Sequence, residues 1–412
     1  MNSRDLQIVR DLAGRVAEIA ASGENQARRA EWYRHNALQA GKALIFCSPE
    51  GSWLEINEQP ELAPQCEDET ARGYEAALRA RLYQWEHFAD DEVMENRWSV
   101  GHALVQTGYG LEPVYHRTED TERGSCVWDA PIKEPSDLAK LTVPTTTVDW
   151  DASRERLAES QEVFGDILDV QLRSFHWWTL APGYSLAQLR GLEQFMLDMV
   201  ERPEWVHEAM AWFRDAKLEW LASLQAQGLL TLNNTNDYVG SGGFGFTEEL
   251  PGAGFDPAHV RTQDMWGFFE NQETTAISPR MFKTFMLDYQ LPIMELFGLN
   301  CFGCCEPLHD RFEYVLQIPR LRRISISPWC DREISARALQ NKYLFSWKPN
   351  PARLASEVMN EEVVRRDIRE TLEIARGCVV EIILKDTHTC RHEPQRFDRW
   401  CRIAREEVER AS

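Results

Sequence analysis

The chain has 412 residues, of which 43% are hydrophobic and 27% are charged. This composition is ordinary for a globular protein, and a chain of this length can bury enough apolar surface to fold without disulfides. The formal net charge is −21, so the surface repels phosphate backbones and nucleic acid is not an expected partner. No apolar run reaches about 18 residues, and residues 1–32 lack a signal-peptide core, so we expect a cytoplasmic protein without a membrane span.

The segment before residue 150 is mostly helical in pattern. Apolar positions recur at helical spacing in residues 3–40 and 69–88, whereas residues 43–54 and 101–109 are strand-like. We therefore expect residues 1–150 to form an N-terminal, mostly helical extension. This segment could cap the rest of the chain or mediate a homodimer.

From about residue 153, helical and strand-like segments alternate. The pattern predicts helices at 153–163, 185–201, 203–227, 279–297, 308–317, 331–339, 360–376 and 394–410. It predicts strands at 165–175, 229–234, 299–304, 322–328, 343–347 and 379–385. Such alternation is typical of βα units and a parallel sheet. We expect an α/β fold in which residues 151–412 form a (β/α)8 TIM barrel, although only six strands are visible in the pattern.

Active sites of such barrels lie at the carboxyl ends of the strands. The predicted strand 299–304 ends in two thiols and a carboxylate, Cys304, Cys305 and Glu306. Zinc accepts cysteine, histidine and carboxylate ligands, so these residues are candidate metal ligands. Neighbouring residues on a regular strand point to opposite faces, which opposes joint ligation, and buried structural cysteines are the alternative.

A second candidate ligand follows the strand 379–385. His388 lies in the segment from Lys385 to Cys390, and histidine is the commonest neutral metal ligand. Cys390 is a weaker candidate for the same role. A hydrogen-bonded or solvated histidine in a polar loop is the alternative.

The strand 165–175 leads into His176, Trp177 and Trp178. We take His176 as a candidate catalytic residue and the two indoles as candidate substrate-binding residues, because indole faces suit flat or cationic ligands. Alternatively, the tryptophans seal the top of the barrel.

Polar residues follow residues 229–234, and a glycine-rich loop comes next. Asp237 and Tyr238 are candidate catalytic residues, and Asn233 and Asn234 are candidate substrate-binding residues. The loop from Gly240 to Gly245 lacks the spacing of a phosphate-binding or dinucleotide-binding loop.

A further polar cluster precedes the helix 279–297. Its Gln272 and Glu273 are candidate substrate-binding residues, with a solvated loop as the alternative. The chain contains neither a G-x-S-x-G elbow nor an H-E-x-x-H helix, so the usual hydrolase motifs are absent.

The order of several motifs resembles the uroporphyrinogen decarboxylase-like superfamily over roughly residues 100–410. The motifs are Ala181-Pro182-Gly183-Tyr184, Gly191-Leu192-Glu193-Gln194-Phe195, Arg202-Pro203-Glu204-Trp205-Val206, Ser278-Pro279-Arg280-Met281-Phe282 and Lys348-Pro349-Asn350-Pro351. True decarboxylases of the family carry an arginine-rich R-Q-A-G-R segment, which is missing here. The chain looks more like the zinc-dependent cobalamin (corrinoid) methyltransferases. Overlaying their ligand segments places Phe302 at the histidine, Cys304 at the first cysteine and His388 at the last cysteine.

The resemblance implies a zinc-dependent methyltransferase. Zinc would be held by Cys304, His388 and either Cys305 or Glu306. The methyl group would move between a small methylated substrate or thiol and a corrinoid on a separate protein, because the chain has no D-x-H-x-x-G cobalamin motif. A metal-independent decarboxylase in which His176 or Asp237 handles protons, or a non-catalytic binding barrel, is the alternative.

Overall fold

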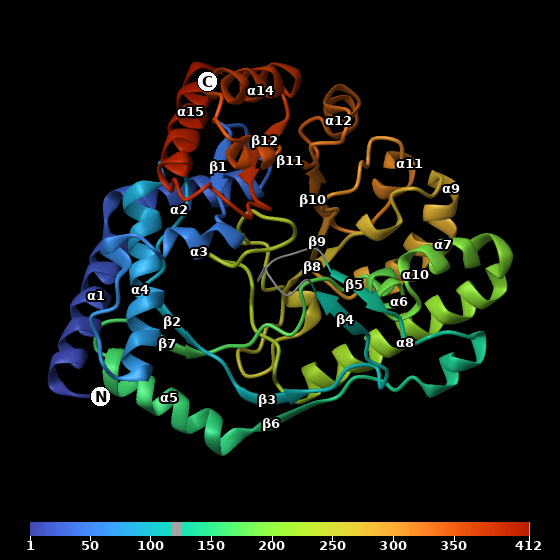
Figure 1. The fold of residues 1–412 in the computed structure, drawn as a ribbon, viewed down its shortest axis with the longest axis horizontal. Coiled ribbons are helices and arrows are strands. Elements are labelled where there is room, and N and C mark those ends of the chain that lie inside the picture. Colours follow the sequence, from blue (N-terminus) through green and yellow to red (C-terminus); the bar gives the residue numbers. More distant parts are fainter. Residues whose placement is uncertain (118–125, 412) are drawn as a thin grey trace.

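The structure, a computed structural model, describes residues 1–117 and 126–411. Its central element is a parallel sheet of six strands, with helices arranged around it (Figure 1). In spatial order the strands are β1 (Leu44–Cys47), β12 (Val379–Leu384), β11 (Leu344–Trp347), β10 (Leu321–Ile326), β9 (Leu299–Phe302) and β8 (Trp266–Phe269). The expected α/β architecture with a parallel sheet is therefore confirmed.

The strands of this sheet are buried on both faces. Every residue of β12 is buried, and its register with β11 pairs Leu344 with Val379 and Trp347 with Ile382. Continuous runs of apolar and β-branched residues are typical of parallel strands covered by helices. Three buried charged residues interrupt these runs, Arg323 in β10, Glu381 in β12 and Lys348 just after β11.

Side chains cover the two edges of the sheet where further strands would be needed to close a barrel. At β1, Asp91 Oδ2 accepts from the amide of Ile45 at 2.8 Å, and Asp90 Oδ2 accepts from the amide of Cys47 at 3.1 Å. No strand in residues 1–117 or 126–411 joins β1 to β8. The described sheet is therefore not a closed barrel.

Residues 229–234 were expected to form a strand, and this prediction is wrong. The segment is a loop, and it meets β8 through one side chain. Asn233 Oδ1 accepts from the amide of Trp266 at 2.9 Å, while Asn233 Nδ2 donates to the carbonyl of Trp266 at 3.0 Å. The amide side chain thus replaces the backbone ladder of a paired strand. The true neighbour of β9 is β8, a four-residue strand containing Gly267.

Three two-stranded sheets make up the rest of the β structure in residues 1–117 and 126–411. They are the parallel pair β2 (Arg97–Val100) and β7 (Asp169–Leu172), and the antiparallel pairs β3 (Ala103–Gln106) with β6 (Thr146–Asp149) and β4 (Val114–Arg117) with β5 (Cys126–Asp129). The segment before residue 150 is thus richer in strands than its helical pattern indicated. It also supplies β1 to the main sheet, while the division into domains at residue 150 stays a prediction.

Helices occupy the periphery of the view in Figure 1, where α15 and α14 lie beside β12 and β1. The α-helices are α1 (Ser3–Ala21), α2 (Gly23–Asn36), α3 (Trp53–Ile56), α4 (Glu69–His87), α5 (Trp150–Phe164), α6 (Pro182–Arg190), α7 (Leu192–Glu201), α8 (Pro203–Ala226), α9 (Pro279–Met281), α10 (Asp288–Met294), α11 (Phe312–Val315), α12 (Arg332–Leu339), α13 (Ala352–Ala355), α14 (Glu361–Ile374) and α15 (Gln395–Ala411). Side-chain caps such as Asp68 for α4 and Asn360 for α14 accept the first free amides. No helix in the described part is long and apolar enough to cross a membrane.

Two helices expected to be continuous are broken. The segment 185–201 divides into α6 and α7 at Gly191, whose φ of +86° is open to glycine but costly for other residues. The segment 279–297 contains a π-helical turn over residues 282–287, and Pro292 lies inside α10. Proline lacks an amide and disrupts the helical ladder, which accounts for irregularity in this region.

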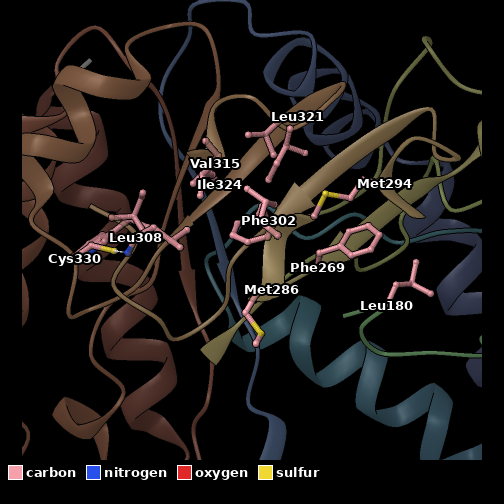
Figure 2. Packing of buried hydrophobic residues seen from close by; sticks show 14 of the residues in the cluster. Leu180, Phe269, Met286, Met294, Phe302, Leu308, Val315, Leu321, Ile324 and Cys330 are labelled. Carbon is pink, nitrogen blue, oxygen red and sulfur yellow. Dashed lines mark hydrogen bonds between the residues drawn. The ribbon is translucent and has the colours of Figure 1, made fainter. Parts of the chain in front are cut away.

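The hydrophobic core continues from the sheet into the surrounding helices. Figure 2 shows Phe302 among Phe269, Met286 and Ile324, and Phe302 is only 1% exposed. Its ring also meets that of Phe282 edge-on, with ring centroids 6.1 Å apart. The residue that the family overlay placed at a histidine ligand is therefore part of the core.

Candidate active site

A cavity of about 720 Å³ lies beyond the carboxyl end of β7 and along β8. A small organic molecule fits a cavity of this size. Its walls combine aromatic rings with a few polar groups, and its lining residues are Arg97, Ser174, Phe175, His176, Trp177, Trp178, Leu230, Thr231, Asn233, Asn236, Asp237, Tyr238, Val239, Gly240, Met265, Trp266, Gly267 and Phe268.

The two neighbouring tryptophans of the cavity have different surroundings. Trp177 is half-buried and meets Trp220 edge-on at 5.8 Å between ring centroids, so it belongs largely to the packing. Trp178 is 48% exposed and meets Phe268 and Tyr184 at 5.7 Å each. The free indole face at the cavity mouth is therefore that of Trp178.

His176 lines the cavity as a neutral imidazole. Its Nε2 donates to the carbonyl of Leu229 at 3.1 Å, and burial lowers the pKa of the ring. Its buried Nδ1 has no partner among the described residues. One hydrogen bond through Nε2 thus fixes the ring. Nδ1 retains its lone pair, but this atom is shielded from solvent.

Asp237 is held in ion pairs. Its Oδ1 lies 2.9 Å from Arg173 Nη2 and 3.3 Å from Arg97 Nη2, and its Oδ2 accepts from Thr235 Oγ1 at 3.2 Å. The carboxylate is 3% exposed. A role as proton carrier would require breaking these contacts, so the geometry favours a role in positioning Arg97 at the cavity wall.

The remaining candidates after residue 230 have separate positions. Asn234 lies outside the cavity lining, and its Nδ2 donates to the carbonyl of Leu250 at 2.7 Å. Tyr238 lines the cavity, is 42% exposed and packs its ring 6.0 Å from that of Phe46. Although part of the side chain is exposed, burial of its hydroxyl end raises the pKa of the phenol, so it stays protonated and can donate a hydrogen bond.

The thiol cluster lies at the end of β9. Cys304 Sγ and Cys305 Sγ are 3.7 Å apart. Cys304 Sγ also accepts from Ser241 Oγ at 3.3 Å and from Lys385 Nζ at 3.7 Å, and it is 4% exposed. The hydrogen bond from Cys305, opposed by burial and aided by the Lys385 ammonium, lowers the pKa of the Cys304 thiol. Cys304 thus bears an activated sulfur.

Lys385 and Tyr238 connect this cluster to the cavity. Lys385 Nζ contacts Asp386 Oδ1 at 2.9 Å. Burial opposes protonation of Lys385, but the nearby Cys304, Tyr238 and Asp386 outweigh it and raise the pKa of the ammonium. A fixed positive charge therefore stands at the end of β12, close to a phenol that lines the cavity.

Three glutamates lie beside the thiols. Glu306 is fully buried, and its two carboxylate oxygens accept from the amides of Asn271 and Cys304 at 2.8 Å each. Burial, with the charges of Glu273 and Glu306, raises the pKa of Glu270 well above its usual range. Burial also raises the pKa of Glu273. Gln272 donates its backbone amide to Glu270 Oε2 at 3.0 Å and lies outside the cavity lining.

The four predicted zinc ligands are not gathered around one point. Both oxygens of Glu306 accept backbone amides, and His388 is exposed. Cys390 instead donates to Glu55 Oε2 at 3.1 Å. Among residues 1–117 and 126–411, no group of three or more histidine, cysteine or acidic side chains is placed to hold a metal ion. The donor set in this form does not fit zinc.

A buried charged network under the site was missed by the sequence analysis. Arg323 Nε and Nη2 bond Glu381 at 2.8 and 3.2 Å, and His35 Nε2 lies 3.1 Å from the same carboxylate. Lys348 and Ser346 extend the network, because Lys348 donates to Ser346 Oγ and Ser346 donates to Glu381. The only signal in the sequence was charged residues within otherwise apolar strands.

The glycine-rich loop lies directly against this network. Gly243 has a φ of +85°, and a Cβ there would lie 2.8 Å from Glu381 Oε1 and 3.0 Å from Arg323. Phe244 presents its carbonyl to Arg323 Nη2 at 3.1 Å. The loop therefore covers the interior and places Ser241 beside Cys304.

Comparison with known proteins yields a likeness in fold. No protein-family model matches the chain, and no curated protein matches it in sequence. Among solved structures, a methyltransferase from Methanosarcina mazei aligns with a TM-score of 0.51 and 11% sequence identity. The alignment covers 93% of this chain and 99% of the other. The two chains share a fold. At this identity the likeness extends to the fold alone, across nearly the whole of both chains.

Proposed function

We propose that the chain is a methyltransferase acting on a small methylated compound or thiol bound in the aromatic cavity. The observation that carries this proposal is the position of the cavity. Its lining residue Tyr238 interacts with Lys385 of the Cys304–Lys385 cluster, which follows the carboxyl ends of β9 and β12, in a fold shared with a methyltransferase. Active sites of parallel α/β folds lie at this end of the sheet. In the same proposal, the six-stranded sheet and the β2–β7 pair are parts of a distorted (β/α)8 barrel of the uroporphyrinogen decarboxylase-like type.

The cavity walls would bind and orient the substrate. Trp178 presents a free indole face, which suits a methylated aromatic or cationic group. Arg97 and the phenol of Tyr238 supply hydrogen-bond donors for its polar atoms. Binding by apolar walls with a few fixed polar groups is typical of small-molecule sites.

Methyl transfer from a neutral ether or thioether leaves negative charge on the heteroatom that loses the methyl group. The Lys385 ammonium is a preorganised positive charge at the end of β12, and Ser241 Oγ adds a neutral donor 3.3 Å from Cys304 Sγ. Such fixed groups stabilise a developing anion without reorganisation. In this function Lys385 stabilises the departing oxygen or sulfur.

The other methyl carrier in this proposal is a corrinoid on a separate protein. Zinc in this site stays a prediction, and elemental analysis of the purified chain tests it. If zinc is bound through the two neighbouring thiols, Cys304→Ala and Cys305→Ala each lose it, whereas His388→Ala retains it because that side chain is exposed.

The test is a direct assay of methyl transfer. The purified chain is mixed with reduced cobalamin and with methoxy-arenes, methyl thioethers and methylamines in turn, and methylcobalamin is followed by absorbance. We expect one class to react, Lys385→Met to abolish transfer and Trp178→Ala to raise KM. Lys283→Met is the matched control, because Lys283 pairs with Asp288 in an exposed position.

Two results would count against this function. One is wild-type turnover by Lys385→Met, and the other is failure of every methylated class. Release of carbon dioxide from a small carboxylic acid in place of methyl transfer would assign the chain to the decarboxylase alternative.

A further inference from the structure

The two neighbouring thiols, Cys304 and Cys305, face each other. Their sulfurs are 3.7 Å apart, and Gly303 has a φ of +92° directly after the end of β9. The backbone has left the extended conformation at this point, so the alternation of side chains along a strand no longer applies. Two consecutive side chains therefore point to the same place.

The two thiols have different surroundings. Cys304 is nearly covered and faces Lys385 Nζ and Ser241 Oγ, a cation and a hydroxyl that stabilise a thiolate. Cys305 is half-buried, and its sulfur lies 3.6 Å from Asp386 Oδ2. One sulfur is thus arranged as a nucleophile and the other as a more accessible partner beside it.

All ten cysteines of the chain are free, and another close pair provides an internal comparison. Cys47 and Cys401 are within hydrogen-bonding distance of each other, but both are fully buried. Burial raises the pKa of both thiols. Proximity is therefore shared by the two pairs, whereas activation by a lysine belongs to Cys304.

We propose that Cys304 and Cys305 form a peroxide-sensitive dithiol switch that closes reversibly into an intramolecular disulfide. Cys304 thiolate attacks one oxygen of a hydroperoxide, which breaks the O–O bond and gives a sulfenic acid and hydroxide or alkoxide. The Cys305 sulfur then attacks Cys304 Sγ and expels water after proton transfer. Overall, two thiols lose two protons and two electrons, and the peroxide is reduced to water, or to water and an alcohol.

The switch acts on the candidate active site itself. Closing the disulfide removes the thiolate that faces Lys385 and Ser241, so the charge of Lys385 loses its buried partner. A small thiol reverses the step by thiol–disulfide exchange. The inference rests on the geometry of the thiols and is independent of whether methyl transfer is the reaction.

The experiment uses the wild-type chain, limiting hydrogen peroxide and mass spectrometry of peptides. We expect the peptide that contains Cys304 and Cys305 to lose the mass of two hydrogen atoms before any other cysteine reacts, and dithiothreitol to restore it. Cys305→Ser should stop at a sulfenic acid that dimedone traps. Lys385→Met should slow oxidation by about ten-fold, because the thiolate loses a neighbouring cation.

Cys378→Ser is the control, since Cys378 is also half-buried but its thiol donates to the carbonyl of Ala336 and packs against the core. This variant should oxidise at the Cys304–Cys305 peptide at the wild-type rate. The proposal is overturned if Cys378 or the Cys47–Cys401 pair reacts first in the wild type. It is also overturned if the Cys304–Cys305 peptide stays reduced. Because these readouts are masses, failure of methyl transfer would leave the result interpretable.

Discussion

The most informative perturbation of the interior is Glu381→Gln. Glu381 is 0% exposed and Arg323 is 1% exposed, so their two hydrogen bonds of 2.8 and 3.2 Å are fully shielded from water. The substitution keeps the shape of the side chain and removes its charge. Arg323 then loses the only carboxylate that it bonds in the described structure. Lys348, which reaches the same carboxylate through Ser346, loses that negative charge as well.

Removing one partner of a buried ion pair typically costs about 3–5 kcal/mol, because the remaining charge stays buried without compensation. We expect Glu381→Gln to lower the free energy of unfolding by that amount in urea denaturation at pH 7. The matched control is Glu249→Gln, whose partner Arg322 also binds it through two contacts, of 2.6 and 2.8 Å. Glu249 is 49% exposed, so its pair should contribute only about 0–1 kcal/mol.

The pH dependence of this difference provides a second check. Burial raises the pKa of Glu381, but Arg323 and His35 outweigh it and hold the pKa well below its usual range. A carboxylate with a depressed pKa stabilises the fold above its unfolded pKa of about 4.3, and this contribution fades as pH falls toward the folded pKa. The gap between wild type and Glu381→Gln should therefore narrow below about pH 4. A loss under about 1 kcal/mol at pH 7 would refute this interpretation of the network.

Three further changes have defined outcomes. Burial lowers the pKa of Lys348 to about 7, so between about pH 7 and pH 10 this side chain is mostly deprotonated in the folded chain and protonated in the unfolded chain. The stability of the wild type should therefore rise relative to that of Lys348→Met across this range. Tm values of both proteins at about pH 7 and pH 10 measure the difference. Gly240→Ala should destabilise the chain by more than about 1 kcal/mol in urea, because φ is +71° and the new Cβ would lie 2.8 Å from Cys301 Cβ. Trp32→Ala should lower the free energy of unfolding in urea by about 3–5 kcal/mol, because the indole is fully buried and donates to the carbonyl of Asp91 at 2.7 Å. A decrease below about 1 kcal/mol would contradict this expectation.

The main elements after residue 153 could be predicted because long helices and buried strands leave strong periodic patterns. β9 to β12 and helices such as α8 and α15 lie where the pattern places them. β8 was not predicted, because a four-residue strand that contains a glycine is too short to show a periodic pattern of apolar residues. The segment 229–234 misled because its alternation of apolar and polar residues is that of a strand, whereas Asn233 bonds β8 through its side chain.

The candidate site was predicted in part. Strand ends directed attention to Cys304 and Cys305, which lie just after β9, and to His176, Trp178 and Tyr238, which line one cavity. The orientation of loop side chains could not be predicted, because no periodicity applies after a strand ends.

Buried charges are also hidden from periodicity. A charged residue inside an apolar strand gives no sign of its partners, and those of Glu381 come from α2, β10 and β11. Only the folded arrangement of these elements identifies the network.

Methyl transfer to reduced cobalamin by wild type and Lys385→Met, assayed side by side, tests the proposed function most directly. The proposed function predicts methylcobalamin formation from one methylated class with the wild type and none with Lys385→Met, while Lys283→Met reacts at the wild-type rate. Equal rates for wild type and Lys385→Met, or no methylcobalamin from any class, would contradict it.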